Sequence, residues 1–173
     1  MKTEVERRKP QGIKDYFSLA MTTFGVGYLP LAPGTWGSMV GVAIYLGVAH
    51  LAKNLTIGLI QAVILVSILL FSLLGIWASN RAIPLLGNED PSQAVIDEVI
   101  GQLIVFLFVP FAISWSLVLA GFILFRLFDI WKPYPIRSFE VLPGGLGICA
   151  DDIVAGIYGG ICLSVIYAVV SWF

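Results

Sequence analysis

The sequence predicts an all-α integral membrane protein, a helical bundle of about four to five helices, some of them short. Composition is the first reason: 58% of the 173 residues are hydrophobic and 12% are charged, against about 45–50% and about 25% in ordinary soluble domains. The mean hydropathy is +0.93. Distribution is the second reason, because four long stretches contain no Asp, Glu, Lys or Arg, namely 16–52, 54–80, 99–125 and 153–173.

The domain organisation is expected to be simple. Residues 1–15 form a cytoplasmic N-terminal tail, and residues 16–173 form a single membrane-embedded domain. The tail mixes acidic and basic residues and lacks a small-residue cleavage site, so it is not a signal peptide. The composition excludes disordered and nucleic-acid-binding proteins and almost every soluble enzyme.

The apolar stretches predict the helices in order. Ser38–Leu51 is short and follows a Gly/Pro-rich segment, whereas Leu55–Trp77 and Ile153–Phe173 are each long enough to span a bilayer. As one helix, Val99–Phe125 would extend about 40 Å, which is long for a bilayer. Pro110 lies near its middle. We therefore expect a hairpin of two short helices that turns around Pro110–Ser116.

The hairpin determines the predicted topology. It places residues 1–15, 81–98 and 126–152 on one side of the membrane, together with all the acidic residues and every basic residue except Lys53. Short loops rich in Lys and Arg favour the cytoplasmic side. The charged residues therefore face the cytoplasm.

Acidic residues at the predicted membrane boundary are candidates for function, because charge is costly there. Asp90 is expected to cap a helix that begins at Pro91, with Asp97 two turns further on the same face. An adjacent acidic pair, Asp97 and Glu98, then enters an apolar helix and requires a metal ion or a basic partner. The same boundary carries Asp129, Asp151 and Asp152. Either Asp151 or Asp152 can cap the final helix, and the other is not needed for capping.

Two further segments suit a phosphate. Lys132 and Arg137 flank a stiff Pro-Tyr-Pro turn that holds two cations apart, although a membrane-interface anchor is an equally good interpretation of this segment alone. Thr35 and Ser38 lie in a Gly/Pro-rich loop ahead of an apolar helix. Capping of that helix is the favoured interpretation of the loop, and phosphate binding at the helix N-terminus is the alternative.

These groups together predict a class of chemistry. Carboxylates hold Mg²⁺ when its other ligands are water and substrate phosphates, and nearby cations neutralise developing charge. The chain has one histidine, His50, which argues against a mechanism that needs two histidines. The favoured chemistry is therefore Mg²⁺-assisted hydrolysis of a phosphate at the cytoplasmic membrane surface. The alternative is a membrane cation or lipid transporter or binding protein that uses the acidic cluster as an ion site. A transporter would place some of the acids near the midplane, not at one boundary.

Four strings in the sequence resemble the bacterial phosphatidylglycerophosphatase A family. They are APGTWGS, DPSQAVIDEVIGQ, FRLFDIWKPYPIR and GGLGICADDIVAG, and they span residues 32–156 in the order of the family. The resemblance implies Mg²⁺-dependent hydrolysis of phosphatidylglycerophosphate to phosphatidylglycerol and inorganic phosphate. It also implies a multi-pass protein of the bacterial cytoplasmic (inner) membrane, with the active site facing the cytoplasm.

The resemblance also suggests residue roles. Asp97, Glu98, Asp151 and Asp152 are expected to bind the metal, Asp97 is expected to be essential for catalysis, and Asp90 or Asp129 is the candidate base. The residues expected to bind phosphate are Lys132, Arg137, Thr35 and Ser38. The expected partners are the phospholipid substrate and the bilayer, without nucleic acid. Glycine-rich segments permit close helix packing and leave a homo-oligomer open.

Overall fold

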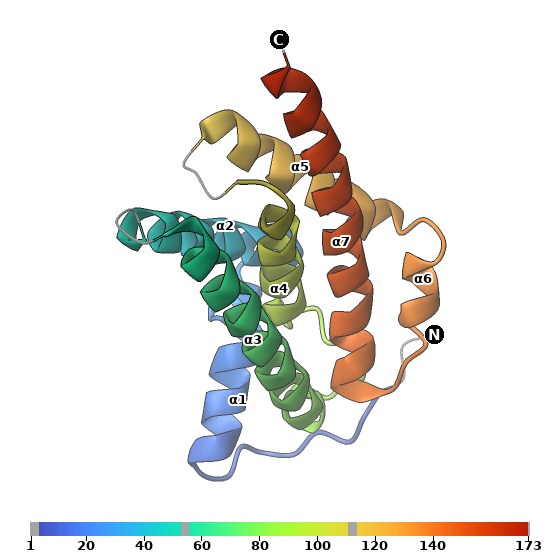
Figure 1. The fold of residues 1–173 in the computed structure, drawn as a ribbon. Coiled ribbons are helices and arrows are strands. Elements are labelled where there is room, and N and C mark those ends of the chain that lie inside the picture. Colours follow the sequence, from blue (N-terminus) through green and yellow to red (C-terminus); the bar gives the residue numbers. More distant parts are fainter. Residues whose placement is uncertain (1–3, 53–55, 111–113, 173) are drawn as a thin grey trace.

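The computed structural model describes residues 4–52, 56–110 and 114–172, and the fold within these ranges is all-α (Figure 1). The all-α prediction is confirmed, but the predicted helix number was too low. The described residues form seven α-helices and two short 3₁₀ helices: α1 Ile13–Thr23, η1 Val26–Tyr28, α2 Pro33–Leu51, α3 Ile57–Leu86, α4 Ile96–Val105, η2 Phe106–Phe108, α5 Trp115–Trp131, α6 Ile136–Phe139 and α7 Gly144–Ser171.

Three of these helices are long and apolar enough to cross a membrane: α2, most of α3 (Leu59–Leu86) and α7. Large apolar side chains on α3, such as Leu69, Leu70 and Leu73, are well exposed. A continuous exposed apolar face of this kind is typical of a surface that contacts lipid. α3 and α7 are both longer than predicted, and α7 begins at Gly144 instead of Ile153.

The predicted break near Pro110 is present. α4 and η2 end at Phe108, and α5 begins at Trp115 and crosses α7, on which it packs (Figure 1). Residues 111–113, within the predicted turn, lie outside the described residues, as do Lys53 and Asn54 between the first two apolar stretches. The stretch from 99 to 125 is therefore divided between two helices.

The short helix α4 is the centre of the bundle. It packs along α7 and α2, and it also contacts α3 and α5 (Figure 1). Its side chains Ile96, Val99, Ile100 and Val105 are fully buried, whereas α3 exposes large apolar side chains such as Leu65 and Leu69. Groups carried by the first turn of α4 are therefore surrounded by other helices.

The segment before α1 is bound to the end of α3. The backbone N–H of Val5 donates to the carbonyl of Gly87, and that of Arg8 donates to the carbonyl of Pro84. The Arg8 and Arg81 guanidinium groups lie 2.8 and 2.7 Å from the carboxylate of Asp15, whose side chain is fully enclosed. The hydrogen bond from Arg8 and another from the Gln11 backbone lower the pKa of Asp15 to about 2. The predicted domain boundary at residue 15 stays a prediction.

Candidate metal and phosphate site

The acidic pair Asp97 and Glu98 occupies the first turn of α4. Negative charge is favoured there by the helix dipole and by the free backbone N–H groups of the first turn. Both residues are half-buried. Asp97 Oδ1 and Glu98 Oε2 are buried and have no hydrogen-bond partner among the described residues. Such atoms are costly unless a ligand or ion satisfies them.

Asp152 on α7 completes a carboxylate triad. One oxygen each from Asp97, Glu98 and Asp152 can be chosen so that all three lie within 4.8 Å of one another. The triad is possible because the backbones of α4 and α7 touch at Gly101 and Gly156, each one helical turn after a triad residue. A Cβ atom on Gly156 would lie 2.4 Å from the carbonyl oxygen of Gly101.

The electrostatics of the triad favour a cation. Burial raises the pKa of Asp97 well above its usual range, and the neighbouring Glu98 and Asp152 carboxylates raise it further. Burial also raises the pKa of Glu98. Carboxylates held together in this way cannot all ionise without a compensating positive charge. The unpartnered oxygens and the all-carboxylate donor set fit a hard divalent metal ion.

Asp129 lies beside the triad, near the end of α5. Its carboxylate is an electrostatic neighbour of both Asp152 and Glu98. One Oδ atom of Asp129 accepts a hydrogen bond from Arg126, one helical turn earlier. Arg126 also faces α2, because a Cβ atom on Gly34 would lie 2.9 Å from its Nη1 atom.

Lys132 supplies a second cation, at the end of α5. Its Nζ donates to Asp151 Oδ2 at 2.5 Å and to Glu140 Oε1 at 2.7 Å. Burial lowers the pKa of Lys132, but its bonds to Asp151 and Glu140 outweigh this effect and leave the pKa raised. Lys132 is therefore a permanent cation. Its backbone has φ 45°, a left-handed conformation that is unfavourable for a residue with a side chain.

The loop before α2 closes the site from another direction. A Cβ atom on Gly34 would lie 2.3 Å from Glu98 Oε1, so a side chain here would displace the Glu98 carboxylate. Leu31 and Ala32, just before it, have φ values of 64° and 54°. Left-handed backbone at two successive non-glycine residues stores strain, and such strain is typical of functional sites.

The structure brings together most of the predicted site residues. Asp97, Glu98 and Asp152 form the triad, and Asp129 lies beside it. Asp151 is outside the triad: one oxygen binds Lys132, and Oδ1 is buried without a partner among the described residues. Its place deep in α7 contradicts the expectation that one of the two aspartates caps this helix. Asn80 Oδ1 instead accepts from the backbone N–H of Gly145 at the start of α7.

The expectation for Asp90 was wrong in its local structure. α4 begins at Ile96 and not at Pro91, so Asp90 is not its N-cap and does not share a helical face with Asp97. The backbone N–H of Val95 is bonded to the carbonyl of Thr22, which holds the preceding residues in a turn. Asp90 lies in this connection, outside the triad.

The three remaining phosphate candidates differ in their surroundings. Thr35 is half-buried in the first turn of α2, next to Gly34. Ser38 is fully buried and its hydroxyl donates to the carbonyl of Gly34, so it does not cap α2. Arg137 is exposed on α6 and forms no ion pair within the described ranges.

The sequence interpretation missed two kinds of residue. It did not name Arg126 as a candidate site residue, although an arginine that ends a long apolar stretch was a signal. It also did not predict the contacts of Gly34, Gly101 and Gly156, which depend on how helices from distant parts of the chain meet.

Comparison with known proteins supplies independent information on the chain. A family model described as "Phosphatidylglycerophosphatase A" matches residues 19–167. A Haemophilus influenzae protein named phosphatidylglycerophosphatase A is 38% identical over 171 residues, which cover 98% of each chain. The Escherichia coli K12 protein of the same name is 36% identical over 78% of this chain and 73% of its own length.

A third relative carries a different name. A Bacteroides thetaiotaomicron protein provisionally named phosphatidylinositol-3-phosphatase is 40% identical over 83% of this chain and 89% of its own length. No solved structure gives a significant match. The names of the relatives agree on a phosphorylated phospholipid and differ in its headgroup.

Proposed function

Because the chain belongs to the phosphatidylglycerophosphatase A family, we propose that it hydrolyses phosphatidylglycerophosphate to phosphatidylglycerol and inorganic phosphate. One observation carries the proposal. The triad of Asp97, Glu98 and Asp152 leaves buried carboxylate oxygens without partners among the described residues, beside the cations Arg126 and Lys132. An anionic phosphate and a divalent ion together would balance these charges.

The metal that we propose is Mg²⁺, held by Asp97, Glu98 and Asp152. Its preference for oxygen ligands suits a donor set of carboxylates without histidine or thiol. The free Oδ1 of Asp151 supports its predicted role as a further ligand. When bound, Mg²⁺ would supply a Lewis acid that withdraws charge from the phosphoryl group.

The cations are proposed to bind the phosphate oxygens. Lys132 directly follows α5, and Arg126 lies in the turn before the last turn of this helix. The ion pairs of Lys132 with Asp151 and Glu140, and of Arg126 with Asp129, orient the two cations. Thr35, in the α2 turn that touches Glu98 and Arg126 through Gly34, would donate its hydroxyl to the same phosphate. Ser38 would act indirectly by fixing that turn, and the exposed Arg137 would attract the anionic headgroup.

Asp129 is our candidate for the base, in preference to Asp90. It neighbours the triad, whereas Asp90 lies in the connection before α4. Asp129 would accept a proton from the attacking water as the water oxygen bonds to phosphorus. The bond from phosphorus to the glycerol oxygen then breaks, and that oxygen takes up a proton.

We propose that the site faces the cytoplasm. The site lies where α2, α4 and α7 begin and α5 ends, so it is at one end of the membrane-spanning helices. That end also carries the basic residues of the segment before α1 and of the α5–α6 connection. Basic loops favour the cytoplasmic side, where the lipid substrate would meet water.

The test is phosphate release by the purified, detergent-solubilised chain, with and without Mg²⁺. Phosphatidylglycerophosphate, phosphatidylinositol 3-phosphate and phosphatidic acid are compared at equal surface concentration. Mg²⁺-dependent release from the first lipid alone supports the proposal, and faster release from the second would replace the substrate. Release from none of the three with any divalent ion would refute hydrolysis and favour an ion site of another kind.

A further inference from the structure

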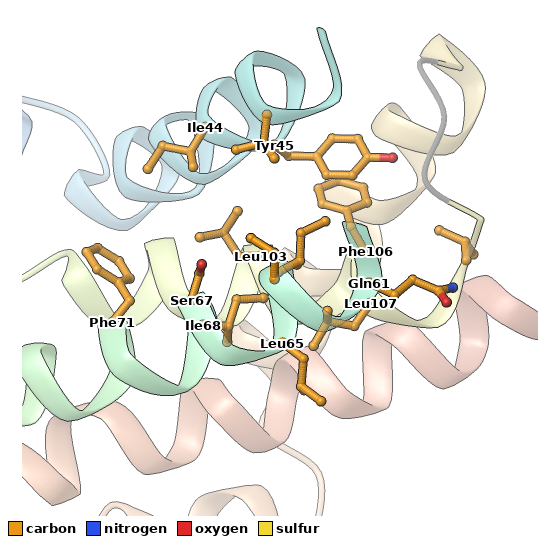
Figure 2. A pocket seen from close by; sticks show the side chains of 14 residues that line it. Ile44, Tyr45, Gln61, Leu65, Ser67, Ile68, Phe71, Leu103, Phe106 and Leu107 are labelled. Atoms are coloured by element: carbon orange, nitrogen blue, oxygen red, sulfur yellow. The ribbon is translucent and has the colours of Figure 1, made fainter. Parts of the chain in front are cut away.

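An apolar cavity lies between α2 and α3, with a volume of about 460 Å³ (Figure 2). Ile44 and Tyr45 of α2 line one side of it, and Ile68 and Phe71 of α3 line the other. Its inner wall is formed by Leu103 of α4 and by Phe106 and Leu107 of η2. The volume is in the range of sites that hold a small organic molecule.

The cavity exists because two consecutive helices diverge. α2 and α3 have almost no direct packing with each other within the described residues, although each packs on α4. Stacking of Tyr45 on Phe106, with ring centroids 4.2 Å apart, holds one wall in place. In a bilayer such a space is filled by hydrocarbon, because water would find almost no polar partner there.

The cavity and the carboxylate triad share α4, and α2 reaches from Gly34, beside Glu98, to the cavity. Leu103 follows Glu98 by about one and a half turns, or about 8 Å along α4. Ile44 follows Gly34 by about 15 Å along α2. Both helices therefore lead from the charged site into the cavity, and on α3 the lining continues from Phe71 to Gln61, about 15 Å towards the other side of the membrane.

We propose that this cavity binds one acyl chain of the phospholipid whose phosphate is held at the triad. The inference rests on the proposed function for the identity of the headgroup. The occupant must have a charged end and a long apolar end separated by about 8–15 Å, and a phospholipid has this form. A hydrocarbon chain also leaves no polar group unsatisfied against the apolar walls.

The first test measures binding and does not depend on catalysis. The full chain in mixed micelles is irradiated with a phosphatidylglycerol that carries a diazirine in one acyl chain, and the labelled peptides are mapped by mass spectrometry. We expect labelling of Leu103, Leu107 and Ile68 several-fold above that of the lipid-exposed Leu69 and Leu73. Labelling spread evenly over exposed and cavity residues would overturn the proposal.

The second test fills the cavity. Figure 2 shows the Ser67 side chain rising from α3 towards α2, so Ser67→Trp would occupy the space. Ala62→Trp is the matched control, because Ala62 is an exposed residue of α3 that does not line the cavity. We expect Ser67→Trp to reduce cavity labelling at least five-fold and Ala62→Trp to leave it unchanged. Equal labelling in both variants would overturn the proposal.

Turnover then tells the two proposals apart. If the chain hydrolyses the lipid, Ser67→Trp should raise KM for long-chain substrate about ten-fold and leave KM for a short-chain, water-soluble analogue unchanged. An equal change in KM for both substrates would refute acyl-chain binding and retain the phosphatase. Chain-specific labelling in a protein without phosphatase activity would refute the proposed function and retain the acyl-chain site.

Discussion

Replacement of Gly156 by alanine tests how the triad is assembled. Gly156 lies one turn after Asp152 on α7, and Gly101 lies one turn after Asp97 on α4. The new Cβ atom would lie 2.4 Å from the carbonyl oxygen of Gly101, about 1 Å short of the 3.4 Å of ordinary contact. Backbone cannot rotate away as a flexible side chain can, so α4 and α7 must separate by about that distance.

The separation has two expected consequences. Overpacking of this kind lowers the free energy of unfolding by about 1–3 kcal/mol. At the triad, Mg²⁺ requires near-ideal octahedral geometry, and a displacement of about 1 Å at reacting groups lowers rates by about 10²-fold. We therefore expect Gly156→Ala to lose about 10²-fold in kcat/KM and to need a higher Mg²⁺ concentration for half-maximal activity.

The assay is phosphate release as a function of Mg²⁺ concentration, with thermal unfolding followed in the same detergent. Gly47→Ala is the control, because a Cβ atom added to this α2 residue would meet no atom of a neighbouring element within 4 Å among the described residues. It should leave kcat/KM unchanged and stabilise α2 by up to about 1 kcal/mol. Full activity with an unchanged Mg²⁺ requirement in Gly156→Ala would show that close contact of α4 and α7 does not form the site.

Three further predictions concern individual charges. Asp97→Asn should abolish phosphate release while circular dichroism shows an intact helical fold; appreciable activity would contradict its assignment. Burial raises the pKa of Asp97 and of Glu98, and bound Mg²⁺ must displace their protons, so calorimetry should show the Mg²⁺ Kd falling as pH rises. Without metal, the folded state holds these two protons more tightly than the unfolded state. The free energy of unfolding of the metal-free protein should therefore fall as pH rises through these raised pKa values. A Mg²⁺ Kd that does not change with pH would argue against the raised pKa values of Asp97 and Glu98. Asp15 affects stability in the opposite direction, because its pKa in the folded state is about 2, below the usual 3.8. Its contribution to the free energy of unfolding is therefore complete above pH 3.8 and is lost as pH falls towards 2. The difference in melting temperature between the wild type and Asp15→Asn should therefore shrink over that interval, and a constant difference would exclude the ion pairs as its cause.

Hydropathy and charge patterns were sufficient for the fold class and for the break in the chain near Pro110, because both depend on local composition. The start of α7 was not predictable in this way. Gly144 and the residues after it are not apolar enough to signal a span, and Asn80 of α3 supplies the partner for the first free N–H group. A contact between distant segments thus decides where the helix begins.

The candidate site shows the same division. The identities of Asp97, Glu98 and Asp152 could be selected from sequence, because carboxylates adjoining apolar segments are costly without a function. That the three carboxylates converge could not be predicted from sequence, because their convergence depends on the close approach of Gly101 to Gly156. The turn that displaces Asp90 from α4 was also unpredictable, because the Val95 N–H binds a carbonyl contributed by Thr22 of α1.

The ion pair between Lys132 and Asp151 has a consequence for biogenesis. Asp151 and Asp152 lie about 11 Å along α7 from its start, where a carboxylate opposes insertion of an isolated helix. Lys132 is separated from α7 by the segment that contains α6, and α5 and α7 pack against each other. We therefore expect α7 to insert stably only when Lys132 at the end of α5 is in place to pair with Asp151.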